Sequence, residues 1–380
     1  VVFSGDMKGV YPNMEKLNRT FVSHKANYIV IYDDAASATS GRTFEWRLQT
    51  KGELTPAGDK TYNITNGDAS ALAQILSPAE AEWSVTTNKI GNILRARLGN
   101  QQTNKYMVLL WPNADNLDAV SENIDTEEAL GIKVTLNGKN EYTLFGKTEN
   151  QPAEVGDISF NGNTLLLLEN EDESITSSSL VNGNKLTYQN VNYFSSDEKI
   201  NFGIENTSTE TSEILYAVGP SSETVNPENV EVTIGGLAKN KKYYLIQEGD
   251  KTGVAFQTND NGEASVVLDL SENRKFLASV DSVIGEPLGI PNLINDIGNS
   301  IQVYPNPSSG LLNIEMNNPV YDDVFVKVFT IDGKQIINRR FEKTSPGFSA
   351  QLDLGNQRKG IYFISFVFNN QSFTEKIVLN

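Results

Sequence analysis

Apolar and polar residues alternate with a period of two along most of the chain. In residues 43–50, Phe44, Trp46 and Leu48 alternate with polar side chains, which is the pattern of a strand with one buried face. Only residues 67–82 and 113–130 are compatible with short helices. The pattern therefore predicts an all-β chain of β-sandwich type. Between Gly, Asn and Asp turn signals, further strands are predicted at 27–34, 92–99, 105–112, 131–138, 141–147, 163–170, 186–194, 198–206, 213–219, 228–234, 241–248 and 264–270.

The 380 residues exceed one ordinary small domain. A polar stretch with Pro and Gly at 149–157 indicates a first boundary. A second stretch, 285–300, contains Pro and Gly and lacks alternation, which indicates a linker. We therefore expect a β-sandwich at 1–150, a β-rich continuation of it or a separate accessory module at 151–285, a linker at 286–300, and a small β-sandwich of short strands at 301–380.

The last of these parts ends on a strand pattern instead of a polar tail. Residues 359–380, KGIYFISFVFNNQSFTEKIVLN, are apolar almost to the end, although chain ends are usually poorly ordered unless a sheet or a partner holds them. Upstream, the prolines of residues 304–310 fix φ and the glycine permits positive φ, which predicts a turn. Asp332 and Gly333 predict a tight hairpin turn.

Four spaced motifs in this part are VYPNPSSGLLNIEM (303–316), VFTIDGKQI (328–336), KGIYFI (359–364) and FTEKIVLN (373–380). Together they closely resemble the C-terminal sorting domain of the type IX secretion system. The resemblance implies a Bacteroidota-type protein that crosses the inner membrane by a removed signal peptide and the outer membrane through the type IX translocon. The cargo is then released or attached to the cell surface. The implied sorting signal comprises Tyr304, Pro305, Asn306, Pro307, Gly310, Asp332, Gly333, Lys359, Gly360, Ile361, Tyr362 and Lys376.

Two explanations follow for the ordered terminus. In the first, the secretion machinery reads the terminal strand, because an exposed edge can accept main-chain hydrogen bonds from a partner. In the second, the strand completes its own sandwich.

The first fifty residues carry an ordered series of short motifs: Gly5–Asp6, Tyr11–Pro12, Arg19, a Tyr-to-Asp strand at 28–33 and an aromatic-x-Trp strand at 44–46. This series resembles the β-sandwich of heparinase II/III-like polysaccharide lyases. That family cleaves uronic-acid polysaccharides by β-elimination, in which a base removes the proton next to a carboxylate and hydrogen-bond donors neutralise that carboxylate. The resemblance implies that the catalytic α/α toroid and the metal-binding histidines would precede Val1. No catalytic residue is therefore assigned in this chain.

Composition narrows the possible partners. The formal net charge is −17, with 48 acidic and 31 basic residues, which argues against nucleic-acid binding because phosphate backbones require a basic surface. The chain has no cysteine, so it has no disulfides or thiolate sites. No apolar run reaches the ~18 residues of a membrane helix. Because the chain begins at Val1 without Met, we expect it to follow a processing site or boundary.

The single histidine, His24, cannot form a site that needs several imidazoles. We expect it in a polar turn between two strands, with catalysis or ligation as the alternative. Asp115, Asp118 and Asp125, and the NDNG turn at 259–262, are candidate calcium ligands, but neither stretch has EF-hand spacing. Solvated turns are the favoured interpretation. No metal and no cofactor is expected in this chain.

Three arginines are the candidate contacts to an anionic glycan. Arg95 and Arg97 are two residues apart and share one face of their strand, and Arg47 points outward from another strand. Guanidinium groups bind carboxylates and sulfates bidentately. The alternative, and the favoured one, is cross-strand pairing with Glu45 or a neighbouring acid.

The tryptophans offer a possible sugar-stacking platform. Trp83 has acidic neighbours and is the best candidate for an exposed ring. Trp46 and Trp111 lie in apolar strands and are expected in the core.

Two functions remain open at this stage. The first is the C-terminal, non-catalytic β portion of a secreted polysaccharide lyase that acts on uronic-acid polymers. The second is a secreted, non-catalytic glycan-binding or surface-adhesion protein. Whether the chain belongs to an enzyme is left undecided. Both functions imply an anionic polysaccharide and the type IX machinery as partners, and a secreted or surface-attached location.

Overall fold

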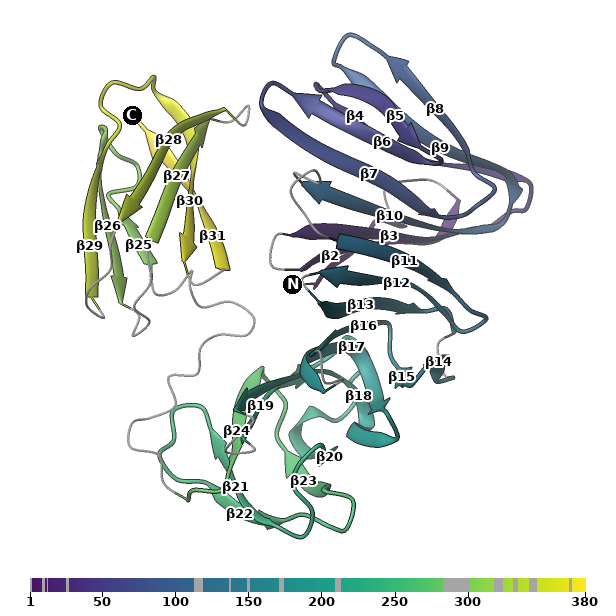
Figure 1. Ribbon diagram of the computed structural model, residues 1–380, viewed down its shortest axis with the longest axis vertical. Coiled ribbons are helices and arrows are strands. Elements are labelled where there is room, and N and C mark those ends of the chain that lie inside the picture. The colour runs from purple at the N-terminus through teal and green to yellow at the C-terminus, as the bar shows by residue number, and fades with distance from the viewer. Residues whose placement is uncertain are drawn as a thin grey trace. The chain divides into compact units, whose positions relative to one another are not determined.

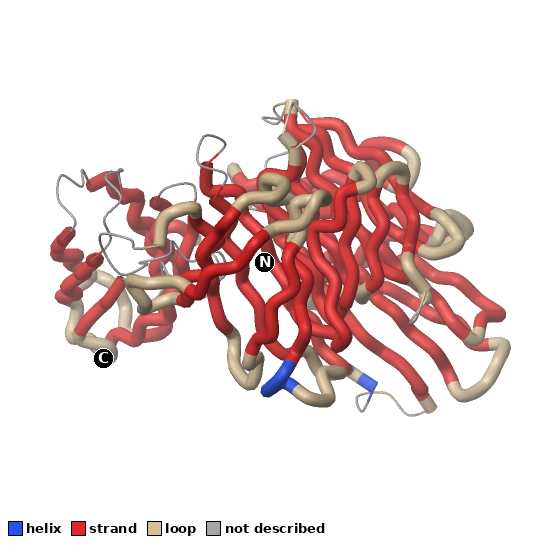
Figure 2. Tube along the Cα trace, turned by 90° about the horizontal axis from the view of Figure 1, so that it is seen from below, coloured by secondary structure: helices blue, strands red, loops and turns tan. Residues whose placement is uncertain are grey.

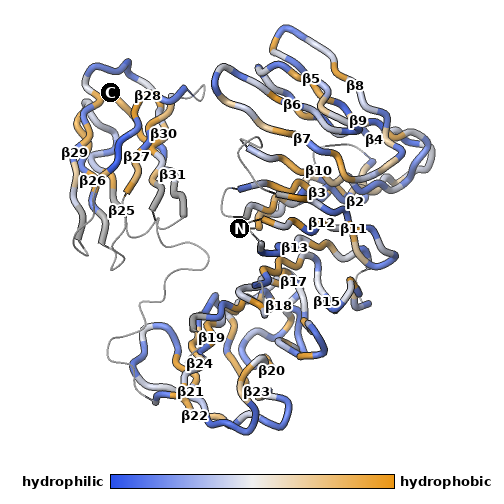
Figure 3. Tube along the Cα trace, viewed as in Figure 1, coloured by the Kyte–Doolittle hydropathy of each residue, from blue (hydrophilic) through white to orange (hydrophobic). Residues whose placement is uncertain are grey.

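The computed structural model describes residues 2–8, 11, 13–24, 27–112, 119–136, 138–148, 151–170, 174–208, 213–282, 301–317, 324–330, 334–341, 347–368 and 371–380. Almost every element in these ranges is a strand (Figure 2). Helical structure is limited to short turns such as the 3-10 helix η3, Pro227–Asn229. The all-β prediction is confirmed. Apolar residues recur along the strands and polar residues gather in the turns (Figure 3), as period-two alternation requires.

The chain begins with three antiparallel strands, β1 (Val2–Asp6), β2 (Met14–His24) and β3 (Tyr28–Ser37). Strand β3 is buried on both faces, which explains its nearly continuous apolar sequence. Trp111 packs against Tyr28 with ring centroids 5.2 Å apart. Trp111 is 5 % exposed, which confirms its predicted place in the core.

The next strands form two layers. One is the three-stranded sheet β4 (Arg42–Thr50), β9 (Asn92–Gln101) and β8 (Glu82–Thr87). The other contains β5 (Glu53–Gly58), β6 (Thr61–Asn66), β7 (Ala69–Ser77) and β10 (Thr103–Pro112). The Tyr106 hydroxyl of β10 lies 3.0 Å from the main-chain oxygen of Phe44 and 3.1 Å from that of Ala96, so it joins the layers.

The short helices that the sequence allowed at 67–82 and 113–130 do not form in the described residues of these two stretches. Residues 69–77 form strand β7, whose alternate residues Ala73, Ile75 and Ser77 are buried. Alanine fits either structure, and pairing with β6 on a sheet decides in favour of the strand. Within 113–130, residues 119–125 form strand β11, and residues 113–118 lie outside the described ranges.

A fourteen-stranded antiparallel sheet follows (Figure 1). Its main path is β11-β12-β13-β16-β17-β18-β19-β24-β21-β22, and β14, β15, β20 and β23 branch from it. The sheet continues across residues 149–157, because β13 pairs directly with β16. Its strands are β11 (Ala119–Asp125), β12 (Ala129–Leu136), β13 (Lys139–Gly146), β14 (Ala153–Val155), β15 (Ile158–Asn161), β16 (Thr164–Glu169), β17 (Ile175–Tyr188), β18 (Val191–Ser208), β19 (Glu213–Pro220), β20 (Val230–Ile234), β21 (Lys242–Gln247), β22 (Val254–Gln257), β23 (Ala264–Leu268) and β24 (Arg274–Ser279).

The two longest strands turn this sheet into a sandwich. The first part of β17 pairs with β16 and its second part pairs with β15. Likewise, β18 pairs first with β20 and then with β19. The register shifts on both sides of Gly183, where a Cβ atom would lie 2.5 Å from the Asn161 main-chain oxygen, so glycine is required at this bend. Both layers bury one core, within which the Phe194 and Phe202 rings stack at 3.9 Å.

The C-terminal strands form a small separate sandwich, as predicted. One sheet is β25 (Ile301–Tyr304), β26 (Leu311–Asn317) and β29 (Gly347–Asp353). The other has the order β28 (Gln335–Phe341), β27 (Val324–Thr330), β30 (Gly360–Phe368) and β31 (Gln371–Leu379). Thirteen buried apolar residues form its core. The predicted linker and the predicted Asp332–Gly333 turn lie outside the described residues.

Candidate functional site

The three predicted arginines meet on one face of the β4-β9-β8 sheet. Arg47 lies opposite Arg95, and Glu45 lies opposite Arg97, because β4 and β9 pair in this register. The Glu45 carboxylate accepts a hydrogen bond from Arg47 Nε and lies 3.1 Å from Arg97 Nε and 3.9 Å from Arg95 Nε. The predicted pairing of the arginines with Glu45 is confirmed.

We call this arrangement the arginine face (Arg47, Arg95, Arg97, Glu45 and Glu82), because Glu82 of β8 also lies opposite Arg97; it carries three guanidinium groups and two carboxylates. The side chains of Arg47 and Arg97 are 61 % and 55 % exposed, whereas Glu45 is only 16 % exposed. Arg95 Nε is buried without a hydrogen-bond partner in the described part of the chain. Glu45 therefore orients the three guanidinium groups, the face keeps an excess of one positive charge, and the exposed N–H groups can bind a carboxylate or sulfate from solution.

Trp83 is less accessible than predicted. It lies opposite Ala96 on strand β9, on the side of the sheet that also carries Trp46. Its ring centroid is 6.5 Å from that of Trp46, its Nε1 is buried, and the residue as a whole is half-buried. Trp83, the best candidate for an exposed ring, is thus a partly covered ring, because the small Ala96 lets the two indoles approach. Trp46 is 3 % exposed, so its predicted place in the core is confirmed.

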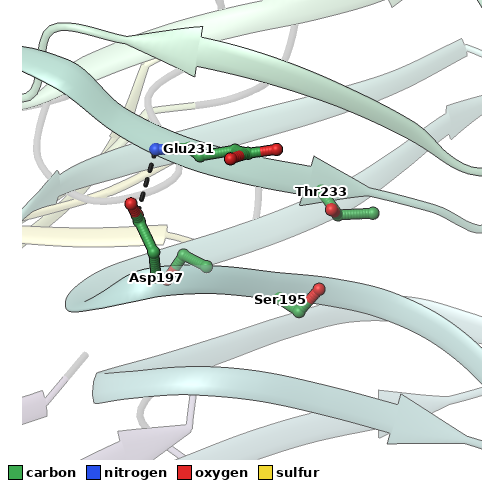
Figure 4. A pocket seen from close by; sticks show the side chains of 5 residues that line it. Ser195, Asp197, Glu231 and Thr233 are labelled. Carbon is green, nitrogen blue, oxygen red and sulfur yellow. Dashed lines mark hydrogen bonds between the residues drawn. The ribbon is translucent and has the colours of Figure 1, made fainter.

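A shallow hollow of about 210 Å³ lies on the outer surface of strands β18 and β20 (Figure 4). It is lined by Ser195, Ser196, Asp197, Glu231 and Thr233. The Asp197 carboxylate accepts a hydrogen bond of 3.0 Å from the Glu231 main-chain N–H, and the Thr233 hydroxyl bonds that of Ser265. Sequence reasoning did not find this hollow, because it depends on pairing between β18 and β20 and on no local motif.

The candidate calcium ligands are engaged by protein donors. In the turn at 259–262, Asn259 Oδ1 accepts hydrogen bonds from two main-chain N–H groups and Asp260 Oδ1 accepts one from Asn240. Asp125 pairs with Lys147, and Asp115 and Asp118 lie outside the described residues. Within the described ranges, no group of three or more His, Cys, Asp or Glu side chains is placed to hold a metal ion. His24 is the last residue of β2, and its side chain is not described.

A buried carboxylate that sequence reasoning missed is that of Glu169, which is 5 % exposed. It accepts hydrogen bonds from the Tyr188 hydroxyl at 2.6 Å and from Asn140 Nδ2 at 3.2 Å. Burial, together with the neighbouring charge of Glu169, raises the pKa of Tyr142 to about 12. Because its carboxylate is satisfied by protein donors, we assign Glu169 a structural role. An acid at the end of the apolar run 164–168 was the available signal.

The residues of the predicted sorting signal hold the terminal strand in place. The Asn306 side chain acts as a short strand: its Oδ1 accepts from the Val378 N–H at 3.0 Å and its Nδ2 donates to the Lys376 oxygen at 2.8 Å. Next, the Ser308 N–H donates to the Val378 oxygen at 2.8 Å and the Asn380 N–H donates to the Ser308 oxygen at 2.9 Å. We call this set of four bonds the terminal clasp.

The clasp closes the outer edge of β31 from residue 376 onward, while β30 pairs with its inner edge. The terminal strand is therefore ordered because it completes its own sandwich, which was the alternative explanation. Ser308 is 2 % exposed, and its Oγ donates to the Leu311 oxygen at 2.9 Å. Gly310 has φ +130°, and a Cβ there would lie 2.6 Å from the Gly355 Cα, so no side chain fits.

Strand pairing brings the dispersed motifs to one end of this sandwich. Gly360 lies opposite Leu379 and Ile361 opposite Val378, while Ser308 forms a bridge with Leu379. Thr330 lies opposite Tyr362, so the FTID motif reaches the same end. The Tyr362 hydroxyl donates to the Arg358 oxygen at 2.6 Å and closes the turn before β30.

Comparison with known families identifies the C-terminal sandwich. Residues 302–380 match the family described as "Secretion system C-terminal sorting domain". No curated protein matches the chain. Two solved structures are remotely similar: dimeric latent PorU from Porphyromonas gingivalis (11 % identity, TM-score 0.22, 93 % of this chain and 31 % of that one) and the BSP domain of a biofilm associated protein (12 %, TM-score 0.18, 95 % and 65 %). The chain thus spans about a third of PorU and just under two thirds of the BSP domain structure, and neither similarity defines its fold.

The C-terminal domain is a type IX sorting domain, and the protein is exported by that system to the cell surface or the medium. Its interaction with the secretion machinery follows from the same domain. Among the described residues, no helix is long and apolar enough to cross a membrane.

Proposed function

We propose that this exported protein binds anionic polysaccharides through the arginine face of its N-terminal sandwich. The observation that carries the proposal is the unequal charge at that face, where three guanidinium groups meet two carboxylates and the one that contacts all three, Glu45, is only 16 % exposed. The whole chain carries a net charge of −17, so a locally basic face stands out from its surroundings. Uronate carboxylates and sulfate esters are the anions that guanidinium forks match in shape.

The binding test uses immobilised alginate and heparin, which offer carboxylate and mixed sulfate–carboxylate groups. We expect the double variant Arg47→Ala/Arg97→Ala to bind at least ~10-fold more weakly, because charge-assisted hydrogen bonds contribute about 1.5–3 kcal/mol each. The Glu45→Gln variant should bind more tightly, since it removes the competing carboxylate. Affinities are measured at two salt concentrations to separate the contribution of counterion release.

Lys239→Ala/Lys251→Ala is the matched control, because it removes the same charge at two exposed turn positions of the fourteen-stranded sheet, outside the sheet that carries the arginine face. Equal weakening by both double variants would show that binding follows net charge and would refute a defined site. Failure of the unmodified chain to bind either polymer would refute the proposal altogether.

A second candidate is that the chain is the β portion of a polysaccharide lyase that acts by β-elimination. It is supported by the resemblance of residues 1–50 to heparinase II/III-like lyases and by the register of two of those motifs, in which Arg19 and Asp33 pair across β2 and β3. The test follows absorbance of the unsaturated uronate product, comparing this chain with the product of its complete gene. Absorbance that rises only with the product of the complete gene supports the lyase. If neither protein raises the absorbance, the lyase candidate is refuted and glycan binding without cleavage remains.

A further inference from the structure

Alternate residues of three sorting motifs point away from the core of the sorting domain. In the β28-β27-β30-β31 sheet, Phe329 lies opposite Phe363, which lies opposite Lys376, and Ile361 lies opposite Val378. Partners in an antiparallel sheet share one face. We call these five residues the outer sorting face.

The neighbours of these residues in sequence have a different role. Val328, Tyr362, Ile364, Ile377 and Leu379 are 0–5 % exposed and belong to the sandwich core. By contrast, Ile361 is 39 % exposed, Lys376 is exposed, and Phe329, Phe363 and Val378 are half-buried. Within each motif, folding therefore uses one set of alternate positions and leaves the other set to face outward.

The outer sorting face has a clear limit. The next row across the sheet is polar, with Lys327 opposite Ser365 and Ser365 opposite Thr374. Beyond that row lies Phe325, which is 39 % exposed, like Ile361. The apolar residues thus gather at the end of the sheet where the terminal clasp lies, and Phe325 is separated from them.

The terminal clasp restricts how a partner can bind at that end. The outward main-chain groups of Lys376, Val378 and Asn380 are already bonded to Asn306 and Ser308. A partner strand cannot add to β31 along these residues without displacing the clasp. Recognition at this end therefore uses side chains on the sheet face.

Charge defines the kind of partner. Among the described outward side chains of the four strands, none is acidic, and Lys327, Arg340 and Lys376 are basic. Residues 302–380 contain eight Lys or Arg and seven Asp or Glu, in a chain whose total is −17. An apolar centre with a basic border is complementary to an apolar protein surface that carries carboxylates.

We infer that the outer sorting face is the surface that docks onto an acidic, apolar-lined site of a protein component of the type IX machinery. This inference rests on export by that system and names which side chains of the sorting domain make the contact. The inward residues of the same motifs form the core of the sandwich and do not contact this partner.

The test produces the full chain, preceded by a cleavable export signal, in a Bacteroidota host with an intact type IX system and in a matched strain without the translocon. The fraction of protein in the medium and on the cell surface is compared with the periplasmic fraction. For Ile361→Ser/Phe363→Ser and for Lys376→Glu, we expect the exported fraction to fall about tenfold, because the loss of central apolar anchors and the reversal of a charge each weaken binding at an interface. Phe325→Ser and Lys251→Glu should be exported like the unmodified chain.

Thermal unfolding of the purified variants separates recognition from folding. We expect each variant of the outer sorting face to unfold at the same temperature as the unmodified chain and yet to accumulate in the periplasm. The assignment of this face would be overturned if both variants of the outer sorting face were exported normally, or if Phe325→Ser lowered the exported fraction as much as they do. Neither result would contradict export by the type IX system. If the unmodified chain itself were not exported in the competent host, export by type IX would fail instead. Binding of the chain to phosphatidylglycerol vesicles that is lost in Lys376→Glu would indicate a membrane surface and overturn the protein partner.

Discussion

Arg19 and Asp33 form a two-point ion pair across strands β2 and β3, with Nε–Oδ1 at 2.6 Å and Nη2–Oδ2 at 2.5 Å. Asp33 is 5 % exposed, and its hydrogen bond raises the pKa of Arg19 above its ordinary value. The pair lies in register within the sheet, so both side chains are held by the backbone as well as by each other.

Removing one partner of this pair should destabilise the N-terminal strands. For Asp33→Ala we expect a loss of about 2–3 kcal/mol, because a largely covered guanidinium group is left without its counter-charge. Lys16→Ala is the control, because it removes the more exposed pair with Asp34 and should cost less than about 1 kcal/mol. Urea unfolding followed by tryptophan fluorescence measures both, since all three tryptophans lie between residues 46 and 111. If both variants lost the same free energy of unfolding, the buried Arg19–Asp33 pair would contribute no more to stability than the exposed Lys16–Asp34 pair.

The Tyr106 hydroxyl predicts a second stability effect. Tyr106→Phe removes the donor shared by the Phe44 and Ala96 main-chain oxygens, and with it the hydrogen bonds that join the two layers. We expect a loss of about 1–2 kcal/mol, with a red shift of Trp46 emission if the layers separate. Tyr62→Phe, on strand β6 where the residue is half-buried, is the comparison variant. An unchanged unfolding midpoint in Tyr106→Phe would mean that the two layers are held by apolar packing alone.

Gly310 predicts a defect confined to the sorting domain. Gly310→Ala places a Cβ 2.6 Å from the Gly355 Cα at φ +130°, so the turn must shift and the clasp beside it weakens. We expect a loss of more than about 1 kcal/mol. Because no tryptophan lies in residues 301–380, the measurement is hydrogen exchange of the Val378 and Asn380 amides. Gly5→Ala, in strand β1, is the control, since its added Cβ has no atom within 4 Å and its φ is not positive. If both amides exchange as slowly in Gly310→Ala as in the unmodified chain, the turn at Gly310 does not stabilise the terminal clasp.

Glu223 predicts a pH dependence of stability. Hydrogen bonds from Lys199 and then from Asn182 lower the pKa of Glu223 below its ordinary value. A depressed carboxyl pKa contributes stability that is complete above the unfolded-state pKa of ~4.3 and is lost as pH falls through the folded-state pKa. Glu223→Gln should therefore lower the unfolding midpoint at pH 7 and show a shallower decline between pH 5 and pH 3. A parallel decline in variant and unmodified chain would exclude Glu223 as a contributor. Glu228→Gln, in the first turn of η3, serves as the comparison.

Much of the fold was predictable because alternation is a local property. The strand containing Trp46 and the strand containing Arg95 and Arg97 were located from their own residues, and the i, i+2 spacing placed both arginines on one face. For residues 67–82 the local pattern left a short helix open, because alanines carry little preference; pairing with β6 decided in favour of a strand. Glu45 was recognised as a possible partner because it alternates with Trp46 on the same strand.

The remaining features depend on pairing between distant residues. Asn306 meets Val378 across 72 positions, and no property of the YPNP stretch indicates that partner. The contact between Trp83 and Trp46 depends on Ala96 lying between them on a third strand, so the exposure of Trp83 could not be judged from its acidic neighbours. The hollow at Ser195 and Thr233 likewise exists only when β18 and β20 are paired.

Strands β17 and β18 are each built into both layers of the large sandwich, and β17 bends at Gly183. A chain pulled at its two ends would therefore load both layers together, since neither can be peeled from the other while these strands remain intact. The hydrogen bonds of β18 to β17, β19 and β20 would have to yield over much of an eighteen-residue strand. Pulling on the chain would thus be opposed by the two layers at once, and not by one layer after the other.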